Sequence, residues 1–351
     1  MKRMGLASFN FSTGTAFVAL ACALSFAAPN NSANAQAPNQ QRFTKVETNW
    51  LAWARKNRVS QSQLALGYRG RIVYSRALNT EIEAPMTLAS LSKAVTGACF
   101  LQLEKDEVLS RDTTLGEFRA EGILRDFSDS AADEVSLTQF LTHTSGLQPD
   151  ITQGNVQNLF NKSENRLEEI ALEAVDARNL RGTIGDYFYN NGNYAVIGAI
   201  IEAKTETTYE EACKEALEEL DGMDGITPSP LLKSISAFGG WQASAQSFLT
   251  FANAAFGQNT DIQNNRFALP YAEIDNNLYY GPGVLFRKNR TLGTNVWHFG
   301  MLCFPDPEYD AGSYFAIIGG DWSVAVTHNK CLKNNAALEL DQTLMQGIFS
   351  R

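Results

Sequence analysis

Ser90 and Lys93 stand three residues apart at the expected start of a helix, in the stretch Leu88-Ala89-Ser90-Leu91-Ser92-Lys93. Because positions i and i+3 share one face of a helix, the lysine amine would lie close to the serine hydroxyl. Burial can lower the lysine pKa enough for the amine to take the serine proton. Free backbone N–H groups at a helix start would stabilise an oxyanion. These are requirements of acyl transfer, but Ser-x-x-Lys arises by chance roughly once in a chain of this length, so partners must be found.

Two later segments carry groups that such a reaction needs. Tyr189 and Asn191 precede an apolar helix, and a tyrosine beside an ammonium can have its pKa lowered and shuttle protons. His298-Phe299-Gly300 is expected at the end of a strand, where the glycine lets a substrate approach and the Met301 N–H can serve as a second oxyanion donor. His298 could bind a substrate carboxylate when protonated or donate a hydrogen bond when neutral. Taken alone, a packing tyrosine and a surface histidine are the commoner interpretations.

Hydrophobic periodicity predicts the elements that must position these groups. The expected helices are 43–58, 90–105, 135–142, 164–177, 193–203, 208–220, 244–256 and 338–350, and the expected strands are 63–68, 72–75, 294–298, 313–318 and 322–328. Two early strands and about three late ones imply one antiparallel sheet assembled from both ends of the chain. The fold class is therefore α+β, with a helical block inserted beside the sheet.

The N-terminus has the pattern of a secretory signal peptide over residues 1–35. A basic start, an apolar run at 16–28 that is too short to span a bilayer, and the small-residue site Ala33-Asn34-Ala35 follow one another. A lipoprotein anchored through Cys22 is the less favoured alternative, since the apolar run continues past that residue. We expect a periplasmic or secreted protein, without stable membrane insertion after cleavage.

The net charge of the chain limits the kinds of partner that it is expected to bind. The 351 residues carry a net charge of −9, which becomes −11 when the two basic residues of the signal are removed. An acidic chain without basic clusters argues against nucleic acids and anionic membrane surfaces. The remaining 316 residues suffice for one large domain or two intimate ones.

Four cysteines remain after cleavage, at positions 99, 213, 303 and 331. Without C-x-x-C spacing, and with only three histidines in the chain, no structural zinc site or other metal is expected. An oxidising compartment permits a disulfide. Cys303 and Cys331 lie near the ends of expected neighbouring strands and are the favoured pair, whereas Cys99 lies among helical core positions and is expected to be a buried thiol.

The combined motifs resemble the serine β-lactamase-like family, which contains class C β-lactamases, DD-carboxypeptidases, D-aminopeptidases and family VIII esterases. The resemblance spans residues 45–335. It is carried by Ser90-x-x-Lys93, Leu141-Thr142-His143-Thr144-Ser145-Gly146-Leu147, Tyr189-x-Asn191 with Tyr194-Ala195-Val196-Ile197-Gly198, Gly239-Gly240-Trp241 with Ser244-Ala245, and His298-x-Gly300. It implies an α/β sandwich domain from 36–105 and 231–351 and a helical domain from 106–230, with the site between them and no cofactor.

The resemblance also implies a role for each site residue. Ser90 would be the acylated nucleophile and Lys93 its activator, Tyr189 the general base and acid, and Asn191 a hydrogen-bonding partner of substrate and lysine. The N–H groups of Ser90 and Met301 would form the oxyanion hole. His143 would anchor a loop below the site.

Two departures from the family pattern bear on the substrate. His298 and Gly300 stand where many members have Lys-Thr-Gly, and a mostly neutral histidine holds a carboxylate less firmly. Phe299 and Met301 are large, so we expect an apolar, narrower wall that favours esters or hydrophobic amides. We therefore predict a serine acyl hydrolase acting on small-molecule or peptidoglycan-like esters, D-amino-acid peptides or β-lactams. The alternatives are a slowly turning-over penicillin-binding protein and a non-catalytic member of the same fold.

Overall fold

The computed structural model describes residues 37–124, 132–153, 166–289 and 293–349. The signal peptide predicted at 1–35 lies outside these ranges and stays a prediction. Within the described residues, no helix combines the length and apolar character that crossing a membrane requires.

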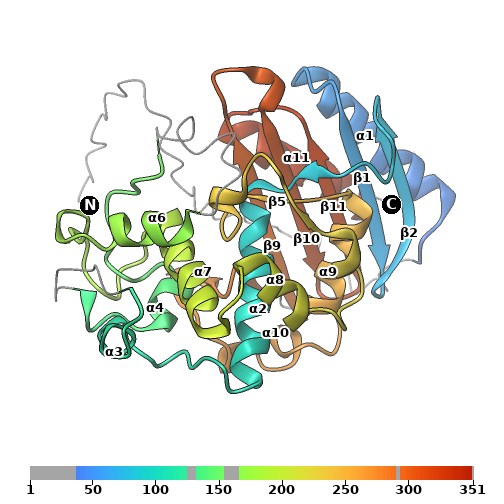
Figure 1. Ribbon diagram of the computed structural model, residues 1–351. Helices are drawn as coiled ribbons and strands as arrows, with labels where there is room; N and C mark the ends of the chain where they lie inside the picture. The colour runs from blue at the N-terminus through green and yellow to red at the C-terminus, as the bar shows by residue number, and fades with distance from the viewer. Residues whose placement is uncertain (1–36, 125–131, 154–165, 290–292, 350–351) are drawn as a thin grey trace, which may run out of the picture.

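An eight-stranded antiparallel sheet forms the centre of the molecule, in the order β2-β1-β11-β10-β9-β8-β7-β6 (Figure 1). Its strands are β1 (Ser62–Tyr68), β2 (Arg71–Leu78), β6 (Ala272–Asp275), β7 (Leu278–Tyr280), β8 (Leu285–Asn289), β9 (Gly293–Leu302), β10 (Ala311–Ile318) and β11 (Trp322–His328). The pairing of β1 with β11 joins the two ends of the chain. The predicted α+β class is confirmed, and the large sheet is built from both ends of the chain, as expected.

Strands β6, β7 and β8 were not expected from the sequence. They are three to five residues long, and the turns between them contain Asn276-Asn277 and Gly281-Pro282-Gly283, so no hydrophobic alternation of useful length develops. A separate small sheet is formed by β3 (Met86–Thr87), β5 (Trp241–Ala243) and β4 (Thr227–Pro228), in that order. This small sheet holds the segment directly before Ser90.

The longer predicted helices are present with shifted ends. The main helices are α1 (Gln40–Lys56), α2 (Ser92–Lys105), α3 (Leu115–Ala120), α4 (Leu137–Leu141), α6 (Leu167–Ala174), α7 (Asn191–Thr205), α8 (Tyr209–Ala216), α9 (Ala245–Phe256), α10 (Asp261–Asn264) and α11 (Asn334–Phe349). Thr208 and Glu211 form the capping box that the sequence predicts at the start of α8.

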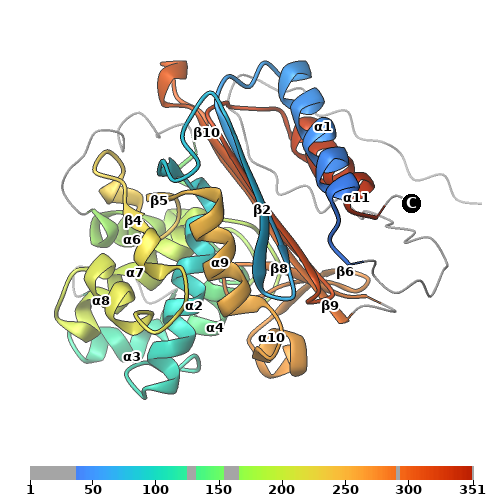
Figure 2. The same ribbon diagram turned by 90° about the vertical axis from the view of Figure 1, so that its right-hand side faces the viewer.

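Two hydrophobic clusters cover the two faces of the large sheet. One cluster packs α1 and α11 against side chains such as Leu64, Tyr314 and Val326. The other joins α2, α4 and α6–α9 to the opposite face through Phe286, Phe315 and further side chains. Figure 2 shows α1 and α11 on one side of the sheet, with α9, α2 and α7 on the other. The helical segment therefore shares its core with the sheet, and the predicted domain boundaries remain a prediction.

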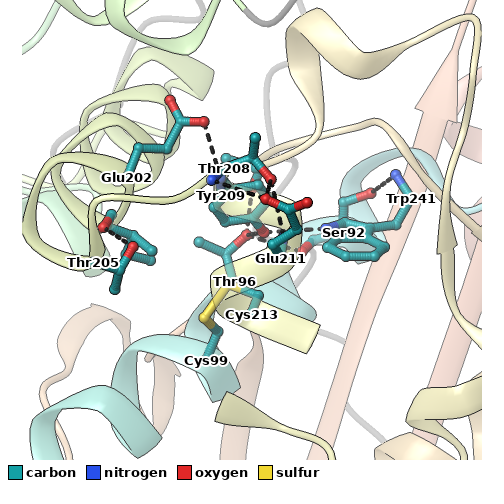
Figure 3. Close-up of a disulfide and its surroundings, with 12 residues drawn as sticks. Ser92, Thr96, Cys99, Glu202, Thr205, Thr208, Tyr209, Glu211, Cys213 and Trp241 are labelled. Atoms are coloured by element: carbon teal, nitrogen blue, oxygen red, sulfur yellow. Dashed lines mark hydrogen bonds between the residues drawn. A yellow bond between two sulfur atoms is a disulfide. The ribbon is translucent and has the colours of Figure 1, made fainter. Parts of the chain in front are cut away.

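Two disulfides link distant parts of the chain. The bridge between Cys303 and Cys331, favoured from the sequence, is present. The expectation of a free Cys99 thiol is wrong, because Cys99 on α2 is bonded to Cys213 on α8 (Figure 3). Cys99 is buried as expected, but the packing of α8 against α2 brings a residue 114 positions later to its side, and local pattern does not reveal that contact.

Candidate active site

Ser90 lies in a 3₁₀ turn, Ala89–Leu91, that precedes α2. The α-helix thus begins two residues later than expected, and Ser90 sits outside its regular hydrogen bonding. Ala89 has a left-handed φ of 50°, a conformation that costs a non-glycine residue about 1–3 kcal/mol. The turn is held on both sides: the Leu88 N–H donates to the Trp241 carbonyl (2.8 Å), and the Ser313 hydroxyl donates to the Leu88 carbonyl. Distant strands therefore impose the strained turn that presents Ser90.

Lys93 is fully buried and is the second residue of α2, three positions after Ser90. Its Nζ lies 3.3 Å from Ser90 Oγ and donates to the Phe238 carbonyl at 2.9 Å. The rings of Tyr189, Tyr194 and Phe238 surround the amine, with Nζ 5.0, 5.8 and 5.7 Å from their centroids. Burial lowers the pKa of Lys93 to about 7, partly opposed by the Asp150 carboxylate, which raises it. The amine is thus able to accept the Ser90 proton near neutral pH.

Tyr189 also contacts Ser90, through a side-chain hydrogen bond. Burial raises the pKa of Tyr189 far above its ordinary value, and the negative charge of Asp150 raises it further. The expectation that this tyrosine has a lowered pKa is therefore wrong. Its hydroxyl stays protonated at neutral pH, which suits a proton donor rather than a base in the free protein.

Asn191 is the first residue of α7 and lies two residues after Tyr189. The resemblance implied a hydrogen bond to Lys93, but the Asn191 side chain bonds to Thr152 instead. Its side-chain amide donates to Thr152 Oγ1 at 2.9 Å, and its Oδ1 is buried without a hydrogen-bond partner among the described residues. Lys93 donates instead to Ser90 and Phe238. The implied hydrogen bond between Asn191 and the lysine is absent, while its contact with substrate stays a prediction.

His298 lies within β9 rather than at a strand end, because β9 continues to Leu302. Its Nδ1 is 2.7 Å from the Phe299 carbonyl, which can only accept, so Nδ1 carries the proton. Its Nε2 faces the Tyr280 hydroxyl at 3.4 Å. Burial and the nearby Lys93 charge lower the pKa of His298 to about 3. The imidazole is therefore neutral at physiological pH.

Phe299 and Met301 point to the face of the sheet opposite Ser90. The Phe299 ring packs against Tyr314, with centroids 4.9 Å apart, in the cluster under α1 and α11. The Met301 sulfur lies 3.2 Å from the Leu332 nitrogen. The expected apolar, narrowed wall at this position is wrong, since side chains alternate along a strand and Gly300 takes the face toward Ser90.

Gly300 brings β9 close to Ser90. β8 pairs with β9 only from Gly293 to Trp297, so the following residues of β9 have no β8 partner. A Cβ at Gly300 would lie 3.0 Å from the Ser90 nitrogen and 2.5 Å from the Leu88 carbonyl oxygen. Only glycine allows this approach. Met301 is the next residue along β9, and the part of its N–H in an oxyanion hole stays a prediction.

We expect Gly300→Ala to slow acylation of Ser90 by about a hundredfold, because the added methyl group pushes β9 away from the Ser90 N–H. Overpacking should also cost about 1–3 kcal/mol of unfolding free energy. Acyl-adduct formation by mass spectrometry and thermal unfolding measure the two effects.

Gly312→Ala is the matched control for this variant. Gly312 is the strand partner of Met301, and a Cβ there would lie 2.0 Å from the His328 ring, away from Ser90. We expect Gly312→Ala to destabilise the protein but to slow acylation less than threefold, because its methyl group does not reach the Ser90 N–H. Equal slowing by both variants would show that strain in the sheet, not the oxyanion contact, accounts for the loss.

His143 anchors the segment that carries Tyr189, as the resemblance implied. Its Nδ1 accepts from the Asn190 N–H (3.3 Å) and from Asn193 Nδ2 (3.0 Å), and its carbonyl accepts from the Phe188 N–H (2.8 Å). The His143 and Tyr189 rings lie 4.4 Å apart. His143 therefore fixes the position of the tyrosine.

The sequence did not single out three residues that the structure brings to the site. Phe238 supplies the carbonyl that accepts from Lys93, and it directly precedes the Gly239-Gly240-Trp241 motif, which was a usable signal. No sequence motif marked Asp150 or Tyr280, since an aspartate in a loop and a tyrosine in a strand are common in any protein. In the described part of the chain, no group of three or more histidine, cysteine, aspartate and glutamate side chains is arranged to hold a metal ion.

Comparison with known proteins agrees with this geometry. A family model described as Beta-lactamase matches residues 52–230, just over half of the chain. No curated protein matches the sequence.

Solved structures share the fold at low sequence identity. A penicillin-binding protein homologue from Pyrococcus abyssi has a TM-score of 0.67 and 19% identity, covering 87% of this chain and 77% of that one. A D-stereospecific amidohydrolase from Streptomyces sp. has a TM-score of 0.68 and 17% identity, with 89% and 99% covered. A beta-lactamase from Sulfitobacter sp. EE-36 has a TM-score of 0.69 and 12% identity, with 90% and 99% covered. At these identities the likeness establishes the fold alone.

Proposed function

Because the chain belongs to the beta-lactamase family, we propose that it is an exported serine acyl hydrolase that works through an acyl-enzyme on Ser90. The contact between Lys93 Nζ and Ser90 Oγ, at 3.3 Å, is the observation that carries this proposal. It places a buried amine with a pKa of about 7 next to a hydroxyl at a strained turn. The substrates are small-molecule or peptidoglycan-like esters or amides, and no metal takes part in the steps below.

In acylation, neutral Lys93 removes the Ser90 proton as the serine oxygen bonds to the substrate carbonyl carbon. The carbonyl electron pair moves to oxygen, and the N–H groups of Ser90 and Met301 stabilise the oxyanion. The tetrahedral intermediate collapses and the bond to the leaving group breaks. Tyr189 protonates the departing atom, and the Lys93 proton returns to the phenolate. In deacylation, Lys93 removes a proton from water as the water oxygen bonds to the acyl carbon. The bond to Ser90 Oγ then breaks, Tyr189 protonates that oxygen, and the Lys93 proton again returns to the phenolate.

This assignment revises the proton path expected from the sequence. Tyr189 has a raised pKa, so it acts as the acid, and Lys93 acts as the base. Asn191 stays a substrate contact in the proposal, with its buried Oδ1 turned to no protein donor in the described structure. The lowered lysine pKa and the hydrogen bond between Tyr189 and Ser90 support these roles.

A fluorophosphonate probe and p-nitrophenyl butyrate test the proposal together. We expect one probe adduct on the purified protein by intact-mass spectrometry, no adduct on Ser90→Ala, and ester turnover that requires Ser90, since acylation depends on that oxygen. Thermal unfolding controls for the fold of the variant.

Incubation with a penicillin separates the alternatives. A penicilloyl adduct that persists for hours, without ester turnover, would favour a slowly turning-over penicillin-binding protein. Failure of the folded protein to form any adduct would point to a non-catalytic member and would contradict the proposed function.

A further inference from the structure

Neither ring nitrogen of His298 has an N–H available for a substrate. Nδ1 donates to the Phe299 carbonyl, and Nε2 faces the Tyr280 hydroxyl at 3.4 Å. The residue is only 4% exposed. A neutral imidazole has a single N–H, and here the backbone carbonyl uses it. His298 therefore has no donor left for a substrate carboxylate.

Tyr280 is itself held in place. It is fully buried on β7, and its hydroxyl hydrogen-bonds with that of Tyr194. The Tyr194 hydroxyl in turn donates to the Leu141 carbonyl (2.9 Å) and accepts from the Gly283 N–H (2.6 Å). The Tyr280 ring also packs against His143, with centroids 4.6 Å apart. Turning His298 toward a substrate would separate its Nε2 from a buried hydroxyl that Tyr194 also contacts.

Asp150 adds a negative charge on the Tyr189 side of the site. Its carboxylate accepts from the backbone N–H groups of Thr152 (3.0 Å) and Asn191 (3.1 Å), at the start of α7. The charge acts on both reacting groups, since it raises the pKa of Lys93 and that of Tyr189. These hydrogen bonds fix the carboxylate beside the start of α7.

We propose that the Ser90 site selects esters and amides whose leaving group carries no carboxylate, with Tyr280 and Asp150 as the residues that determine this specificity. The selectivity rests on the proposed function, because it concerns the substrate of the same acyl transfer. Tyr280 acts by retaining His298, and Asp150 acts by repelling an anion near Lys93 and Tyr189. A neutral leaving group meets neither obstacle.

A matched pair of esters tests the selectivity directly. Phenyl butyrate and 3-carboxyphenyl butyrate share the acyl group and release phenols of similar acidity, and they differ in one carboxylate. We expect kcat/KM at pH 7.5 to be at least about tenfold higher for phenyl butyrate, which corresponds to 1.4 kcal/mol. A carboxylate ester that is hydrolysed equally well or better would overturn the inference alone. Absence of Ser90-dependent hydrolysis of both esters would overturn the proposed function and the inference with it.

Two variants assign the effect to its residues. Tyr280→Phe keeps the ring packing and removes the hydroxyl that faces His298, and we expect it to raise relative kcat/KM for the carboxylate ester about threefold. Asp150→Asn should raise the same ratio of kcat/KM values about fivefold. It should also shift the rise of activity with pH to lower pH, since Asp150 raises the pKa of Lys93.

Asp186→Asn removes an exposed carboxylate in the segment before Tyr189 and is the control. It should change neither the ratio of kcat/KM values nor the pH dependence. If Tyr280→Phe or Asp150→Asn changes both esters by the same factor, that residue has only a packing role and its part of the inference is overturned.

Discussion

Replacing Lys93 with methionine should slow acylation of Ser90 by about a thousandfold or more, since a positioned base contributes two to four orders of magnitude to a rate. The Lys93 side chain is fully buried, so bulk water does not readily take the place of its amine. Methionine fills a similar volume among the rings of Tyr189, Tyr194 and Phe238. Pre-steady-state release of p-nitrophenol from p-nitrophenyl butyrate measures the acylation step. Lys93→Arg, which keeps a charge that cannot be lost, should be equally inactive.

The same residue should set the pH dependence of the wild-type enzyme. Only the neutral amine accepts a proton, so with a pKa of about 7 the acylation rate should rise through pH 7 and level off about one unit higher. A rate that is flat between pH 6 and 8, or substantial acylation by Lys93→Met, would contradict the role of Lys93 as base.

Stability supplies the control that the variant folds. The folded-state pKa of Lys93, about 7, lies below the ordinary value of 10.5, so the unfolded chain binds more protons between these limits. Wild-type stability should therefore rise with pH across that window through this group. Lys93→Met lacks the buried amine, so its stability should show less of this rise and exceed that of wild type at pH 7 by up to about 4 kcal/mol. A well-folded, more stable and inactive variant separates catalysis from folding.

Removing the bridge between Cys99 and Cys213 with paired alanines should lower the free energy of unfolding by about 5 kcal/mol on loop entropy, because the bridge closes a long loop of the unfolded chain. The two cysteines are 114 residues apart and fully buried. Urea unfolding at pH 7.5 measures the loss.

Activity at 25 °C should fall less than threefold in the alanine pair, since hydrogen bonds also join α2 to α8 and β5. Thr96 Oγ1 lies 2.7 Å from the Tyr209 hydroxyl, and Trp241 Nε1 donates to that hydroxyl at 3.1 Å. Figure 3 draws these residues beside the disulfide. These contacts lie between the disulfide and Lys93 along α2. They should keep the amine in place without the bridge.

The second disulfide offers the matched comparison. Cys303 and Cys331 are separated by 28 residues, so removing that bridge should cost about 1 kcal/mol less on loop entropy alone. If the variant with alanines at positions 99 and 213 is as stable as the wild type, the bridge between Cys99 and Cys213 does not constrain the unfolded chain.

Local sequence pattern was enough to predict most of the elements and the proximity of Ser90 and Lys93. The i, i+3 spacing of Ser90 and Lys93 places both on one side of a helix start wherever the helix lies, and the structure keeps them 3.3 Å apart. Alternating and helical periodicities predicted five of the eight strands in the large sheet and the longer helices. The short strands β6–β8 were not predicted, since their pairing depends on β9 and not on their own hydrophobic pattern.

The sequence by itself determined which groups could react: a serine and lysine at helical spacing, a tyrosine before α7, and a glycine that allows β9 to approach Ser90. Only the tertiary structure decided their chemical state. Burial lowers the pKa of Lys93 and raises that of Tyr189, and these directions come from side chains brought in from α7 and the segment before β5. Likewise the engagement of His298 depends on Tyr280, and the partner of Cys99 lies on α8. Spacing along the chain sets local neighbours, whereas solvation, charge and long-range pairing are set by residues that meet only when the whole chain has folded.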